Sequence, residues 1–278
     1  MDDETLALRL SERLFVCPGI ESVALGGSHA SGTADARSDI DLGLYYRPGN
    51  PPDLQSLRGI VAEIDDHGRR EAVTDLDEWG PWVNGGAWIE VDGRRIDLLF
   101  RDLERVAEAI DDCRAGRIAT HFQVGHPAGF STQIYAAEVH LCRVLQDRRG
   151  ALAGLKARTY PYPRALRSAL VAGLWESRSL LDAASKSAAR GDVHHVAGSA
   201  FRAVACMVQA LFGLNERYWT NEKASVSLVD SLPLRPEGFG RRIAMILGRV
   251  GTGPDELQAS LHSLEELVNE CTALPSGP

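Results

Sequence analysis

The segment that most constrains the fold is residues 25–44, LGGSHASGTADARSDIDLGL. Ten residues separate Ser28 from Asp39, where a second apolar stretch begins with the sequence DIDL. The pattern predicts a strand, a glycine turn into a short helix, a loop and a second strand. Because side chains alternate between the faces of a strand, Asp39 and Asp41 share one face and the apolar residues of the motif share the other.

Two carboxylates on one strand face indicate a cation site. Same-face neighbours on a strand are roughly 6.6 Å apart, and two-metal phosphoryl-transfer sites hold their ions about 3.5–4 Å apart, so such a pair can bridge two ions. Gly27 allows the main chain to approach a ligand closely, and the following helix begins with N–H groups that can bind phosphate oxygens. A phosphate-binding turn beside a carboxylate pair predicts metal-assisted phosphoryl transfer.

The Gly27-Ser28 pair and the downstream DIDL sequence resemble the signature of the DNA polymerase β-like nucleotidyltransferase superfamily. The likeness extends to antibiotic nucleotidyltransferases of the kanamycin and lincosamide type and to uncharacterised nucleotidyltransferase-domain proteins. It implies an α+β fold: a small mixed β-sheet nucleotidyltransferase domain with flanking helices, followed by an α-helical bundle domain. It also implies two Mg²⁺ ions and a nucleoside triphosphate, with these site residues: Asp39, Asp41 and a third carboxylate on the metals, and Gly27, Ser28 and Ser38 on the nucleotide.

The third carboxylate is expected on a β-hairpin. Asp92-Gly93 between the β-rich runs 87–91 and 94–100 predicts a two-residue turn. Asp97 lies in the second run, where an acidic residue is costly to bury unless it is paired or binds a cation. Asp97 matches the third metal-binding carboxylate of the superfamily in type and context. The alternative is an edge-strand aspartate that pairs with a neighbouring arginine, Arg95 or Arg101.

Length and composition predict two domains. The chain has 278 residues, of which 44% are hydrophobic, enough for a core in each domain. The β pattern fades near residue 116, so we expect a catalytic domain over 1–116 and a helical domain over 117–278 that holds the acceptor and clamps the nucleotide. The expected strands are 22–25, 40–46, 71–76, 87–91 and 94–100, and the expected helices are 5–16, 53–67, 102–116, 131–145, 164–189, 193–212, 239–249 and 255–274.

Three further residues are candidates in or near the helical half. Lys223 ends the polar and aromatic segment 214–223, which resembles loops that hold the triphosphate in related proteins, and Lys156 is the second candidate. A solvated surface lysine is the alternative, because most lysines are exposed. Glu138 shares the apolar stripe of its predicted helix. It is a possible general base or ligand of a cationic acceptor, or the partner of an arginine.

Charge and motifs limit the classes of function. A net charge of −8 makes nucleic acid an unlikely partner and suits a cationic acceptor. The five cysteines form no C-x-x-C, so neither a zinc site nor a disulfide framework is indicated. No apolar run approaches the roughly 20 residues of a membrane span, and the start, MDDETLALRL, lacks a signal pattern. We therefore expect a cytoplasmic protein. No kinase P-loop is present.

These observations predict a Mg²⁺-dependent nucleotidyltransferase of the EC 2.7.7 type. It would move AMP from ATP to a hydroxyl of a small molecule, such as an aminoglycoside-type antibiotic in antibiotic resistance, and release pyrophosphate. Asp97 or Glu138 would take the hydroxyl proton. One alternative is a toxin-like enzyme that modifies protein or tRNA, and another is a non-catalytic nucleotide-binding sensor. The acceptor and the oligomeric state stay open.

Overall fold

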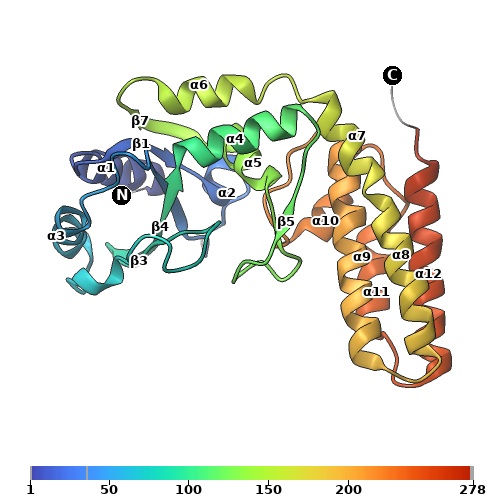
Figure 1. Cartoon of the computed structure of the whole chain (residues 1–278). Coiled ribbons are helices and arrows are strands. Elements are labelled where there is room, and N and C mark those ends of the chain that lie inside the picture. Colours follow the sequence, from blue (N-terminus) through green and yellow to red (C-terminus); the bar gives the residue numbers. More distant parts are fainter. Residues whose placement is uncertain (1, 36, 276–278) are drawn as a thin grey trace. The chain divides into compact units, whose positions relative to one another are not determined.

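A computed structural model describes residues 2–35 and 37–275 and divides the chain into two compact units (Figure 1). The first unit comprises Met1–Asp111, His121–Gly125 and Tyr135–Pro161, and the second comprises Asp112–Thr120, His126–Ile134 and Tyr162–Pro278. No single boundary along the sequence separates the two units, because the chain returns twice to the first unit after residue 111. The assignment of catalysis and acceptor binding to two domains stays a prediction.

A five-stranded mixed sheet forms the centre of the first unit, in the strand order β3-β4-β2-β1-β7. β2 and β4 are parallel, and the other neighbours are antiparallel. The sheet and its flanking helices confirm the predicted α+β class. The strands are β1 (Ile20–Leu25), β2 (Ile40–Tyr46), β3 (Gly86–Val91), β4 (Arg94–Asp102) and β7 (Arg143–Asp147).

One face of this sheet carries the hydrophobic core. Apolar residues alternate along β2 and β4 and are fully buried, whereas Asp41 and Asp97 on the opposite face are half-buried. The buried set packs with the apolar stripes of α1 (Asp3–Phe15) and α3 (Leu54–Ile64). It includes Leu6, Leu10, Ile40, Leu42, Leu44, Leu57, Val61, Ile96, Leu98 and Phe100. The polar face is therefore opposite α1 and α3.

The predicted hairpin is confirmed. β3 and β4 pair from Gly86 opposite Leu99 to Val91 opposite Arg94. Asp92 and Gly93 between them both have positive φ, 52° and 71°, as a two-residue turn between twisted strands requires. α4 (Leu103–Arg114) follows directly. The Asp102 carboxylate caps it by accepting the Glu104 N–H at 2.8 Å.

Two sequence predictions are wrong. The expected strand 71–76 is a short 3₁₀ helix, η1 (Arg70–Ala72), followed by one isolated bridge between Val73 and Ala87. The expected helix 131–145 ends early as α5 (Gln133–Leu141), and the chain then forms β7, which pairs with β1. Local spacing could not reveal this strand, because its pairing joins residues more than a hundred positions apart.

Helices make up most of the second unit, as predicted. The expected helix 164–189 is broken at Gly173, whereas the others differ from prediction by a few residues. Among the described residues, α9 alone is long and apolar enough to cross a membrane, yet 67% of its most apolar window is buried, as in a core helix. The helices are α7 (Arg164–Ala172), α8 (Leu174–Ala188), α9 (Val193–Leu214), α10 (Ser225–Val229), α11 (Phe239–Gly248) and α12 (Pro254–Ala273).

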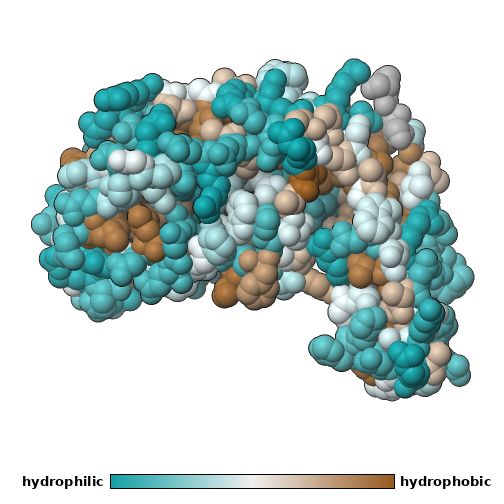
Figure 2. Space-filling view, in the orientation of Figure 1, coloured by the Kyte–Doolittle hydropathy of each residue, from teal (hydrophilic) through white to brown (hydrophobic). Residues whose placement is uncertain are grey.

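Three short elements and one helix complete the chain. They are α2 (Gly27–Ser31), β5 (Thr120–His121), β6 (Phe130–Ser131) and α6 (Ala151–Arg158). The loop after β5 exposes Phe122 and Val124, whose exposed fractions are 88% and 75%. Figure 2 shows hydrophobic residues at the surface over this loop.

Candidate functional site

The parallel pairing of β2 and β4 brings Asp41 and Asp97 together. The register places Asp41 directly opposite Asp97, and both are half-buried on the face opposite the core. Like charges directly opposite each other in a sheet are destabilising, and a bound cation relieves their repulsion. The structure therefore brings two of the three predicted carboxylates to one position of the sheet.

The glycine turn lies against the same carboxylate. The Gly26 N–H donates to the main-chain carbonyl of Asp41 at 2.9 Å, so α2 begins beside Asp41. Gly27 has a positive φ of 56°, and a Cβ built there would overlap the Asp41 carboxylate. Only glycine fits this position without displacing Asp41. Ser28, the next residue, is half-exposed in the first turn of α2.

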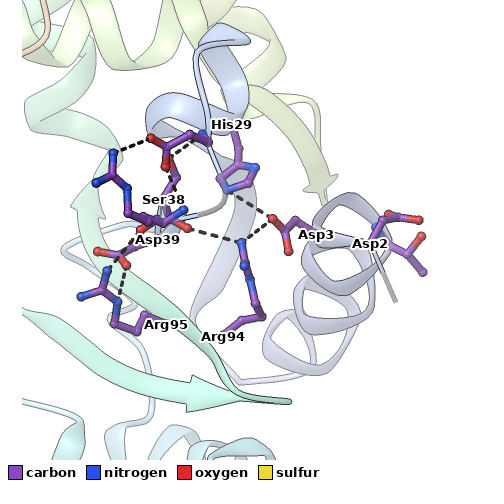
Figure 3. Close-up of polar contacts among 10 residues, drawn as sticks. Asp2, Asp3, His29, Ser38, Asp39, Arg94 and Arg95 are labelled. Carbon is purple, nitrogen blue, oxygen red and sulfur yellow. Dashed lines mark hydrogen bonds and ion pairs between the residues drawn. The ribbon is translucent and has the colours of Figure 1, made fainter.

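Asp39 precedes β2 and contacts an arginine of β4. The Nε of Arg95 lies 2.7 Å from Asp39 Oδ1 (Figure 3). The contact is ionic without hydrogen-bond alignment, and this buried oxygen has no hydrogen-bond partner. Ser38 is held in the preceding turn, where its Oγ accepts the Asp35 N–H at 2.9 Å. Arg95 is therefore the cation that faces Asp39 in this structure.

The donor chemistry of the site fits a divalent cation. Carboxylate oxygens are the ligands that Mg²⁺ prefers, and the unsatisfied Asp39 Oδ1 is a further acceptor. In the part of the chain that the structure describes, no three His, Cys, Asp or Glu side chains are already grouped around one point. Cation binding by all three carboxylates would require Asp39 to exchange its contact with Arg95 for the ion.

A second polar group supports the turn and the loop before Asp39. Arg94 donates to Asp3 Oδ2 at 2.5 Å and to the Ser38 carbonyl at 3.5 Å. The Nε2 of His29 lies 3.8 Å from the same Asp3 oxygen (Figure 3). These contacts connect α1, α2 and β4. Sequence analysis missed Asp3 and Arg94, because their partners are far away along the chain.

Glu138 pairs with an arginine, one of the alternatives that the sequence left open. Arg101 donates from Nε and a terminal nitrogen to the two Glu138 oxygens at 2.7 and 2.8 Å, and Arg101 is only 4% exposed. The Arg101 guanidinium also lies over the Tyr135 ring, 5.7 Å from its centre. Burial raises the pKa of Tyr135 to about 12. This network is satisfied internally and favours a structural role for Glu138.

The two lysine candidates differ in their contacts. Lys156 Nζ donates to the carbonyls of Val139 and Cys142 at 3.4 and 2.7 Å, which caps the C-terminal end of α5. Lys223 is exposed in the second unit, and its main-chain N–H donates to Asn221 Oδ1 at 2.8 Å. The role of Lys223 in binding triphosphate stays a prediction.

Comparisons with known proteins match two segments of the chain to family models. Residues 9–112 match the family model described as a nucleotidyltransferase domain, and residues 132–223 match a domain of unknown function, DUF4037. A solved nucleotidyltransferase-like protein from Exiguobacterium sibiricum is 11% identical with a TM-score of 0.40, and the alignment covers 96% of this chain and 74% of that chain. No curated protein matches the chain.

The nucleotidyltransferase match includes the glycine turn and the three predicted carboxylates. It supports membership of the superfamily, a transferase activity and the general transfer of a nucleoside monophosphate. A nucleotidyltransferase domain implies a nucleoside triphosphate as substrate, and such domains generally use a divalent metal.

Proposed function

We propose that this protein is a Mg²⁺-dependent nucleotidyltransferase of the EC 2.7.7 type, which transfers AMP from ATP to a hydroxyl of a small cationic molecule such as an aminoglycoside. The observation that carries the proposal is the pairing of Asp41 with Asp97, directly beside the Gly27 turn. It combines a carboxylate pair with a phosphate-binding turn, the two parts that phosphoryl transfer needs.

The proposed reaction is an in-line displacement. The acceptor oxygen forms a bond to the α-phosphorus, the bond from that phosphorus to the bridging oxygen breaks, and pyrophosphate leaves. When bound, Mg²⁺ neutralises phosphate charge and lowers the pKa of the attacking hydroxyl. Asp39, Asp41 and Asp97 would hold the cation, and Gly27 and Ser28 would bind the β- and γ-phosphates.

Asp97 is the proposed general base. It lies on the same sheet face as Asp41, so its carboxylate can take the acceptor's proton as the new bond forms. Glu138 is less suited to this step, because Arg101 donates to both of its oxygens.

A labelling experiment tests the proposal. The protein is incubated with four nucleoside triphosphates labelled at the α-phosphate, Mg²⁺, aminoglycosides, lincosamides and a cell lysate. We expect label in a small molecule, and none with the Asp39→Ala, Asp41→Ala double variant. Label in protein or RNA would instead indicate the toxin-like function. Bound nucleotide without any transfer would indicate a sensor.

A further inference from the structure

An exposed tryptophan lies in line with the paired carboxylates. On β3, Trp88 is directly opposite Asp97, and Asp97 is directly opposite Asp41. Paired residues of neighbouring strands share one face of a sheet, and strands are about 4.8 Å apart. The three side chains therefore form one row across β3, β4 and β2, and Trp88 is 61% exposed.

A second tryptophan fixes the position of this ring. Trp79 stacks on Trp88 with ring centres 4.4 Å apart and an interplanar angle of 17°. The loop that carries Trp79 is tied down by Gln123, which is 3% exposed. Gln123 donates to the Trp79 carbonyl at 2.7 Å, and its amide oxygen accepts the Trp82 N–H at 3.2 Å. One face of Trp88 is thus covered by a held ring, and more than half of its surface stays open.

The geometry of the proposed reaction places the open surface of Trp88 on the side from which the acceptor approaches. In an in-line displacement the attacking and leaving oxygens lie on opposite sides of the phosphorus. The Gly27 turn, which would hold the leaving pyrophosphate, follows β1 on one side of Asp41. Asp97 and then Trp88 lie on the other side, toward β3. The acceptor would therefore approach over Asp97 and Trp88.

The charges around the Trp79–Trp88 pair indicate which kind of acceptor would bind there. Glu90 shares the sheet face with Trp88, two residues along β3, and Asp97 is directly opposite Trp88. Arg95 is directly opposite Glu90, but its guanidinium contacts Asp39 at 2.7 Å. His67 lies 3.3 Å from Glu90. The faces of indole rings attract cations, and carboxylates beside them add to that attraction.

We infer that the Trp79–Trp88 pair is the acceptor subsite of this enzyme and binds a cationic, ammonium-bearing group of the acceptor against the open surface of Trp88. The bound acceptor then directs its hydroxyl toward Asp97. The inference rests on the proposed function for its place in the reaction, whereas the binding of a cation by Trp88 requires neither nucleotide nor metal.

Three small ring compounds of different charge test the subsite. Binding of 1-methylnicotinamide (cation), nicotinamide (neutral) and nicotinate (anion) to the full chain is measured by isothermal titration calorimetry in EDTA without nucleotide. We expect saturable binding that is tightest for the cation. Trp88→Ala should weaken the cation's binding by about threefold to thirtyfold, the range of a cation–π contact, and Trp88→Phe should restore part of it. Trp175→Ala is the matched control, because Trp175 on α8 is 68% exposed.

Several results would overturn the inference. They are equal binding by Trp88→Ala and the unaltered protein, equal binding of the cation and the neutral compound, or no saturable binding of the cation. Because Trp88 is mostly exposed, its replacement should cost no more stability than its stacking on Trp79 supplies, and thermal unfolding confirms that the variant is folded. Failure of the proposed function is distinguishable from these results, because it would appear in the labelling experiment as an absence of nucleotide transfer. Where it identifies an acceptor, Trp88→Ala should raise KM for that acceptor and leave KM for ATP unchanged.

Discussion

Two paired positions of the same two strands differ sharply in burial and in the charges that they place opposite each other. Asp41 is opposite Asp97, and four residues further along, Tyr45 is opposite Arg101 on the same face. The Tyr45–Arg101 position is buried, and Arg101 is neutralised by Glu138. The Asp41–Asp97 position is half-exposed and places like charges opposite each other. One position is therefore a buried, neutralised contact, and the other is a half-exposed pair of like charges, which is where we propose that a cation binds.

Removing Arg101 should produce the largest loss of stability. Arg101→Met leaves the Glu138 carboxylate without its partner in a mostly buried place, so we expect a loss of about 3 kcal/mol in the free energy of unfolding. Urea unfolding measures it. Adding Glu138→Leu should recover most of the loss, because the uncompensated charge is then gone. If Arg101→Met lost no more than about 1 kcal/mol in the free energy of unfolding, as for a surface ion pair, the Arg101–Glu138 contact would not be the stabilising one.

Neutralising Asp41 should lower activity strongly without lowering stability. Asp41→Asn should lower turnover at least about a hundredfold, or about 2.7 kcal/mol in the barrier, by removing a main electrostatic group. The unfolding temperature should stay the same or rise, because the repulsion with Asp97 is relieved. Pyrophosphate release and thermal unfolding measure the two effects. Asp92→Asn, in an exposed turn that tolerates asparagine, is the control, and near-normal turnover in Asp41→Asn would refute the metal role.

Two glycines at the ends of α2 test how the turn supports Asp41. Gly27 and Gly32 both have positive φ, 56° and 72°, but an added Cβ meets the Asp41 carboxylate only at Gly27 and open space at Gly32. We expect both alanine variants to lose about 1 kcal/mol from backbone strain. Gly27→Ala should also lose turnover, because the carboxylate is displaced. Equal turnover in the two variants would mean that this contact is unimportant.

The smallest expected effect concerns Asp65, a buried aspartate that forms an ion pair with Arg69. Arg69 donates to both of its oxygens at 2.8 and 2.9 Å, and these bonds hold the Asp65 pKa well below its usual range. A lowered pKa adds stability at neutral pH that is lost as pH falls below the ordinary aspartate value near 3.9.

The expected contribution of Asp65 is about 1 kcal/mol, because Arg69 is partly exposed and screened by solvent. Asp65→Asn should therefore lower the unfolding temperature at pH 7 and have a much smaller effect at pH 2, because the stability is lost only as pH falls from the ordinary aspartate value toward the lowered pKa of the folded state. Thermal unfolding at the two pH values measures the difference. If Asp65→Asn lowered the unfolding temperature equally at the two pH values, the Asp65–Arg69 ion pair would not be the source of the effect.

Local patterns were sufficient for several parts of the fold and the site. The Asp92-Gly93 turn, the start of α4 at Asp102 and the alternation along β2 depend on neighbouring residues, and the structure has all three as predicted. The motif also indicated a glycine turn and a carboxylate pair within one short segment, and the structure places Gly27 directly against Asp41.

The remaining parts depend on contacts between distant residues. The sequence showed an acid at Glu138 on an apolar stripe, but its partner Arg101 is 37 positions away. Arg95 was considered as a partner of Asp97, whereas the structure brings it to Asp39. The proposed role of Trp88 depends on the strand pairing that places it opposite Asp97, which local sequence does not reveal.

The late position of β7 in the chain has a consequence for biosynthesis. β1 is complete at Leu25, yet its outer neighbour β7 ends at Asp147. While the ribosome makes the residues between them, one side of β1 has main-chain groups that lack their final partners. Exposed strand edges promote aggregation, so synthesis that stalls before β7 emerges should yield an aggregation-prone nascent chain that requires chaperone protection.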